Sequence, residues 1–128
     1  MNKKTPLLSL AKHLQRGIKA EDYAAKFLKN QGLSIIARNV RTSRGEIDLI
    51  AKDGETLVFV EVRARQQNAL VSAAASINSS KQNKWRNACS EYLAKNYSTP
   101  PDCRCDAILI SLEKENCRNI EWIKGLFL

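Results

Sequence analysis

Residues 45–65, GEIDLIAKDGETLVFVEVRAR, contain the pattern that decides the fold of this chain. Two runs, 46–52 and 57–65, have the pattern of strands, and Asp53-Gly54 between them is a strong signal for a tight hairpin turn. Acidic residues interrupt both runs at positions where strands normally carry apolar side chains. The stretch therefore predicts two antiparallel neighbouring strands, with side chains alternating between two faces.

The flanking sequence adds helices and strands on both sides of this hairpin. Apolar residues at helical spacing precede Gly32, which is suited to end a helix because its φ can become positive without steric cost. The predicted elements are a helix over 16–31, strands over 33–40, 46–52 and 57–65, a loop over 66–79, a helix from 79 or 80 to 96, a strand over 103–112, and an apolar tail over 120–127 that forms an edge strand or a packed extension. The order αβββαβ predicts an α/β fold with a mixed central sheet flanked by helices.

Length and charge limit the function classes. The 128 residues suit one domain, and 21 Lys+Arg against 13 Asp+Glu give a net charge of +8, which favours polyanionic partners. No apolar run is long enough to cross a bilayer, so we expect no membrane partner. Residues 1–14 have the character of a basic N-terminal arm without a signal-peptide cleavage site, and 15–128 of a single domain. The expected compartment is the cytoplasm.

Four cysteines are compatible with reduced thiols in that compartment: Cys89, Cys103, Cys105 and Cys117. The Cys103-x-Cys105 spacing is wrong for a usual zinc knuckle, and no histidine lies near it. We expect buried, inert thiols.

Two carboxylates on neighbouring strands form the candidate site. Asp48 and Glu61 fall on hairpin partners, and paired carboxylates remain ionised cheaply only when a cation lies between them. Ligation by oxygen alone suits Mg²⁺ or Mn²⁺, and such a cation beside a basic surface indicates phosphodiester chemistry. Glu21 would add a third carboxylate, and Arg63 would contact the phosphate. The alternative is that these residues form ordinary cross-strand pairs on a solvated sheet face.

Other polar and aromatic residues have simpler interpretations. Asp106 is expected to be a structural acid paired with Arg104, and the single histidine, His13, a solvated side chain. Trp85 and Tyr92 are spaced as core residues of a helix. Basic residues that would contact nucleic acid through its phosphates, without base readout, are Arg38, Arg41, Arg44, Arg63, Arg65, Lys81 and Lys84.

The ordered set of motifs resembles the YraN family of small bacterial proteins over about residues 15–127. It comprises Ala20-Glu21, Arg38-Asn39-Val40-Arg41, residues 45–50, residues 59–65 and Arg104-Cys105-Asp106. That family is similar to the restriction-endonuclease-like, PD-(D/E)xK superfamily, and within it to archaeal Holliday junction resolvases. The resemblance implies a restriction-endonuclease-like αβββαβ core. It also implies that Asp48 and Glu61 match the metal-binding acids and Glu21 the helical acid.

The chain departs from the superfamily pattern at one position, where Arg63 replaces the lysine of (D/E)xK. Arginine stays protonated and cannot act as a base, but it can hold a phosphate through two hydrogen bonds.

Three hypotheses follow. The first is a Mg²⁺- or Mn²⁺-dependent DNA endonuclease, with branched or junction DNA as a substrate class, catalytic residues Glu21, Asp48, Glu61 and Arg63, and the Val62 carbonyl as a further ligand. The second is a catalytically silent nucleic-acid-binding module on the same fold, and the third a protein–protein adaptor that uses the sheet face or the Trp122 tail. A homodimer is expected from the resemblance alone, because two scissile strands need two symmetric sites.

Overall fold

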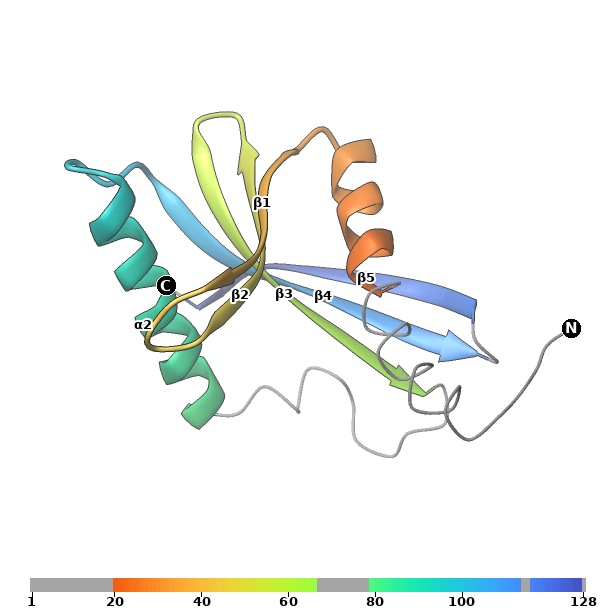
Figure 1. Cartoon of the computed structure of the whole chain (residues 1–128). Helices are drawn as coiled ribbons and strands as arrows, with labels where there is room; N and C mark the ends of the chain where they lie inside the picture. The colour runs from red at the N-terminus through yellow and green to blue at the C-terminus, as the bar shows by residue number, and fades with distance from the viewer. Residues whose placement is uncertain (1–19, 67–78, 114–115, 128) are drawn as a thin grey trace, which may run out of the picture.

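The structure, a computed structural model, describes residues 20–66, 79–113 and 116–127. Its elements are the N-terminal helix over residues 20–30, β1 (Ser34–Arg41), β2 (Glu46–Asp53), β3 (Thr56–Gln66), α2 (Ser79–Asn96), β4 (Cys103–Glu113) and β5 (Asn116–Phe127) (Figure 1). The predicted α/β class and αβββαβ order are confirmed, and β5 adds a strand. The predicted basic arm over 1–14 and most of the predicted loop over 66–79 lie outside the described residues.

The five strands form one mixed sheet in the order β1-β2-β3-β4-β5. β3 and β4 are parallel, and α2 lies between them in sequence as the crossover helix that a parallel pair requires. All other neighbours are antiparallel. β5 lies at the edge of the sheet, which settles the alternatives for the apolar tail over 120–127 in favour of an edge strand.

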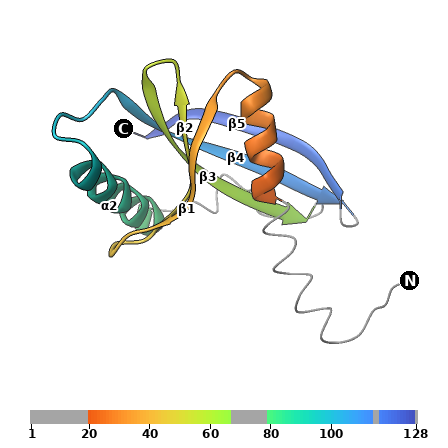
Figure 2. The same ribbon diagram turned by 45° about the horizontal axis from the view of Figure 1, so that its top comes forward.

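The helices cover opposite faces of the sheet, as the alternation along β3 predicts. Val58, Val60 and Val62 pack in a buried cluster with the N-terminal helix, whereas Leu57 and Phe59 pack in another cluster with α2. Figure 2 shows the two helices on either side of the strands. The predicted apolar face of α2 is confirmed by a buried set, Trp85, Ala88 and Cys89, with Tyr92 and Leu93 partly buried beside it.

The predicted end of the N-terminal helix at Gly32 is also confirmed. Gly32 has φ 98°, and the Leu33 N–H donates to the Leu28 carbonyl at 3.0 Å across it. This six-to-one hydrogen bond is the mark of a Schellman C-cap, which needs a residue with positive φ. The cap turns the chain directly into β1.

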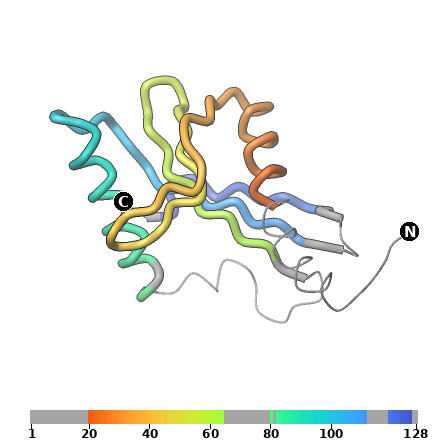
Figure 3. The backbone as a smooth tube through the Cα atoms, viewed as in Figure 1, coloured from red at the N-terminus to blue at the C-terminus, as the bar shows by residue number. Residues whose placement is uncertain are grey.

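The β1–β2 hairpin bends away from the rest of the sheet. Its turn lies beside α2, while β3, β4 and β5 continue past the N-terminal helix (Figures 1 and 3). A Cβ built on Gly45 would lie 3.6 Å from the Lys84 carbonyl and 3.8 Å from the Ala88 Cβ, so this turn passes close to the helix. The bend separates β2 from β3 at the level of the predicted acids. None of the helices in the described residues is both long and apolar enough to span a membrane.

Candidate metal and phosphate site

The two predicted acids lie where β2 and β3 part. The strands pair from Asp53–Thr56 to Leu49–Val60, and the next residues on each strand are Asp48 and Glu61. Beyond that point the Val62 N–H donates to Asp48 Oδ2 at 2.9 Å. The Asp48 carboxylate thus accepts a hydrogen bond from a backbone N–H of β3 just beyond the last paired residues of β2 and β3.

Asp48 and Glu61 contact each other. Their side chains are within hydrogen-bond reach, and Glu61 is only 9% exposed. Burial raises the pKa of Asp48 above its ordinary value, while the hydrogen bond from Val62 and the charge of Arg63 oppose that rise. A hydrogen bond between two carboxyl groups needs a proton on one of them. The pair is therefore a place for either a proton or a cation.

Arg63 supplies a positive charge at this pair. Its Nη2 forms an ion pair with Glu61 Oε2, as expected for residues two apart on one strand face. The Arg63 Nε is buried and has no hydrogen-bond partner among the described residues. Arg63 Nη2 is thus paired with Glu61, while Arg63 Nε is left without an acceptor in the part of the chain that the structure describes.

Glu21 faces the pair from the N-terminal helix. Burial raises the pKa of Glu21, and the charge of Asp48 raises it further. A hydrogen bond from the Asn39 side chain and the charge of Arg38 oppose the rise. Arg38 Nη2 lies 3.9 Å from Glu21 Oε1 and donates to Asp22 Oδ1 at 2.7 Å. Glu21 therefore lies close enough to Asp48 to feel its charge.

A complete protein ligand set is not assembled. Within residues 20–66, 79–113 and 116–127, no group of three or more His, Cys, Asp and Glu side chains is close enough to hold a metal ion. Asp48 and Glu61 come together as a pair, with Glu21 farther away. Two carboxylates nevertheless fit Mg²⁺, which keeps several waters and is commonly bound through one or two carboxylates plus substrate phosphate.

Asn39 completes the surroundings of the acids and was not among the predicted site residues. It lies in the second half of β1 and has φ 52°, which is rare for a residue other than glycine. Its neighbours Arg38 and Val40 pair with Leu49 and Ile47, which places Asn39 across from Asp48. An asparagine inside a β-branched run is the only sequence signal for this role, because asparagine tolerates the left-handed conformation.

The predicted phosphate-contacting residues divide into two groups. Arg41 is highly exposed, with its Nε 3.6 Å from Glu46, and Arg44 and Lys84 are exposed on the turn and on α2 beside it. Arg38 and Arg63 instead form ion pairs with acids at or near the site. The side chains of Arg65 and Lys81 lie outside the described residues.

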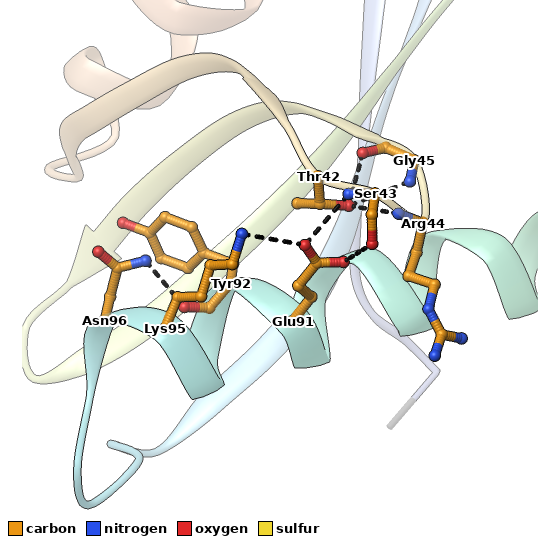
Figure 4. A network of polar contacts seen from close by, with 8 residues as sticks. All are labelled: Thr42, Ser43, Arg44, Gly45, Glu91, Tyr92, Lys95 and Asn96. Atoms are coloured by element: carbon orange, nitrogen blue, oxygen red, sulfur yellow. Dashed lines mark hydrogen bonds and ion pairs between the residues drawn. The ribbon is translucent and has the colours of Figure 1, made fainter.

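A polar network holds the β1–β2 turn against α2 (Figure 4). The Ser43 N–H and Oγ donate to the Glu91 carboxylate at 3.1 and 2.7 Å, and Lys95 Nζ lies 3.3 Å from it. The Ser43 bonds lower the pKa of Glu91. Within the turn, Thr42 Oγ1 accepts from the Gly45 N–H at 3.0 Å. Figure 4 shows the Arg44 side chain extending away from this network.

The family model for the uncharacterised protein family UPF0102 matches residues 20–110, which include all the residues of the acidic site. The chain belongs to this family. It is the YraN family that the motifs resemble.

Similar proteins come from several bacteria. A UPF0102 protein of Dichelobacter nodosus is 49% identical over 112 residues, which are 88% of each chain. One from Nitrosospira multiformis is 47% identical over 112 residues, 88% of this chain and 92% of its own. One from Hahella chejuensis is 42% identical over 122 residues, 95% of this chain and 97% of its own.

Asp106 of this UPF0102 chain lies on β4 opposite Val60, and its hydrogen-bond partners indicate a structural role. It is 0% exposed and accepts hydrogen bonds from Arg104 Nε at 3.1 Å, Trp122 Nε1 at 2.9 Å and the Gly125 N–H at 2.9 Å. Arg104 also donates to Asp53 at 3.0 Å. The predicted pairing of Asp106 with Arg104 is confirmed. The Trp122 ring also meets Phe27 edge to face at 5.9 Å, and Lys124 Nζ lies 4.4 Å from its centroid.

The cysteines meet the expectation only in part. Cys89 is buried and Cys105 half-buried, but Cys103 is exposed, so the prediction of a buried thiol is wrong there. Cys103 is the first residue of β4, where the strand has not yet entered the core. A hydrogen bond with Cys105 and burial raise the pKa of Cys89. The side chain of Cys117 lies outside the described residues.

Proposed function

We propose that this UPF0102 chain is a Mg²⁺- or Mn²⁺-dependent endonuclease of DNA, with branched or junction DNA as the substrate class. The observation that carries the proposal is the contact between the half-buried Asp48 and the buried Glu61, which lie just beyond the last paired residues of β2 and β3. A structural pair of this kind costs stability, because burial and mutual repulsion both disfavour two charges. A cation bound between the two carboxylates would offset this cost, which is why we assign the pair a cation-binding role.

The residues divide the chemistry as follows. Asp48 and Glu61 would hold the cation, and the Val62 carbonyl would be a further ligand. When bound, the cation would lower the pKa of a water and stabilise charge on the phosphodiester. Glu21 would stabilise the site from the helix side. Arg63 would orient the phosphate through its guanidinium, whose buried Nε has no acceptor among the described residues and would gain one if the side chain turned to the phosphate.

A Mn²⁺-supplemented cleavage assay tests this proposal. The substrates are linear, nicked and four-way DNA, and the matched controls are Asp48→Asn and Asp53→Asn. Asp53 is also a β2 aspartate, but it bonds to Arg104 at the far end of the strand. Cleavage that Asp48→Asn abolishes and Asp53→Asn retains would support the proposal. Absence of cleavage on every substrate would contradict it.

A catalytically silent DNA-binding module is the second candidate, and one observation favours it. Arg63 already neutralises Glu61 and cannot serve as a proton acceptor. In that case DNA binding would survive both EDTA and Asp48→Ala with little change. A filter-binding or fluorescence titration under these two conditions separates the candidates.

A further inference from the structure

Arg63 is already bound to Glu61, one of the two proposed metal ligands. Its guanidinium forms an ion pair with Glu61, which is itself in contact with Asp48. A divalent cation that approaches this pair therefore meets a positive charge at the carboxylate that it needs. Metal and guanidinium compete for the same oxygen atoms.

The Arg63 guanidinium does not satisfy all of its hydrogen-bond donors in this position. The buried Arg63 Nε has no hydrogen-bond partner among the described residues, and its side chain is only 26% exposed. A buried donor left without an acceptor costs roughly 1–3 kcal/mol. A phosphate offers acceptors for a two-pronged contact with a guanidinium, which a single carboxylate contact does not provide.

From these two observations we infer that Arg63 is an exchangeable counter-ion that couples metal binding to phosphate binding. The inference rests on the proposed function. In the free protein Arg63 neutralises Glu61. When a DNA phosphate enters, Arg63 turns to the phosphate, and the released Glu61 carboxylate is available to the cation together with Asp48. Arg63 is thus a positioning residue for the metal as well as a phosphate ligand.

The coupling between metal binding and DNA binding is reciprocal, so its size can be predicted for both. If phosphate strengthens metal binding by a given factor, metal strengthens DNA binding by the same factor, and coupling of this kind is typically 5- to 150-fold. The free protein would bind Mn²⁺ weakly and hold it firmly only on DNA.

Calorimetric titration of the full chain with Mn²⁺ tests the exchange without reference to activity. The titration is run near pH 8, where a proton competes least, with and without a four-way DNA junction that carries uncleavable phosphorothioate linkages. We expect the junction to tighten Mn²⁺ binding to the wild type by about tenfold. In Arg63→Gln we expect Mn²⁺ alone to bind about tenfold more tightly than in the wild type, with little further gain from DNA. Lys29→Gln, which removes an exposed helix charge, is the matched control.

Each outcome bears on a different part of the argument. Equal Mn²⁺ affinity in the wild type with and without DNA would overturn the exchange, and this comparison needs no variant to fold. Arg63→Gln that binds Mn²⁺ no more tightly than the wild type would also overturn it, while leaving the metal site in place. Failure of both proteins to bind Mn²⁺ under either condition would remove the proposed metal site itself, and the exchange with it.

Discussion

The Val62 N–H donates to the Asp48 carboxylate at the point where β2 and β3 separate. This contact gives Asp48 two roles, as backbone acceptor and as half of the carboxyl pair. Asp48→Asn retains an acceptor oxygen, whereas Asp48→Ala leaves the N–H of the buried Val62 without one. We expect Asp48→Ala to be less stable than Asp48→Asn by about 1–3 kcal/mol in urea unfolding. Equal stability of the two variants would show that the contact contributes nothing.

Acid should stabilise the site before it unfolds the protein. Folding raises the pKa of both Asp48 and Glu21 above their ordinary values of 3.8 and 4.5. The folded chain therefore binds protons at these groups more tightly than the unfolded chain, and their unfavourable contribution disappears as the pH falls through the folded pKa. We expect Asp48→Asn to raise the free energy of unfolding at neutral pH and to flatten its pH dependence between that raised pKa and 3.8.

Glu91 serves as the comparison for Asp48, because folding lowers the pKa of Glu91 and raises that of Asp48. Its pKa is lowered by the Ser43 hydrogen bonds, so its contribution is present above 4.5 and is lost as the pH falls through the folded pKa. Urea titrations of the wild type, Asp48→Asn and Glu91→Gln across pH separate the two effects. A steeper pH dependence in Asp48→Asn than in the wild type near neutrality would contradict the assignment for Asp48.

Asn39 provides a test of backbone strain against side-chain function. Alanine at φ 52° is strained by roughly 1–2 kcal/mol, whereas glycine adopts this φ freely. We expect Asn39→Ala to lose about 1 kcal/mol relative to Asn39→Gly. Both variants lose the amide that bonds Glu21, so in both the pKa of Glu21 should rise further, as measured by carboxyl NMR. An unchanged Glu21 pKa in both would show that Asn39 does not position this acid.

The sequence predicted the features that follow from the two-residue repeat of a strand. It missed the features that depend on contacts between residues far apart in the chain. The two-residue alternation of strands was enough to place Glu61 with Arg63, and Asp106 with Arg104. It did not predict that the hairpin bends, because the bend is accompanied by the contact of Ser43 with Glu91, forty-eight positions away. It also gave no sign of Trp122 and Gly125 as partners of Asp106, because β5 was only one of two interpretations of the tail.

Asp106 should be essential to stability and irrelevant to metal binding. It is fully buried with hydrogen bonds from three residues, so Asp106→Ala leaves donors unpaired inside the protein. We expect a loss of about 3–5 kcal/mol in urea unfolding. Asp53→Ala removes only the more exposed partner of Arg104 and should cost at most about 1 kcal/mol. If folded Asp106→Ala retained its stability but lost Mn²⁺ binding, Asp106 would belong to the site.

The exposed cations at the β1–β2 turn should govern the salt dependence of DNA binding. Arg41, Arg44 and Lys84 are exposed, and each phosphate contact contributes about 0.9 to the slope of log K against log salt on duplex DNA. We therefore expect Arg44→Gln and Lys84→Gln each to reduce the slope by about 0.9, equally for unrelated sequences. Arg38→Gln should reduce it less, because Arg38 already pairs with Asp22 at 2.7 Å. A larger effect of Arg38→Gln than of Arg44→Gln would place the DNA on the helix side of the acids instead of on the turn.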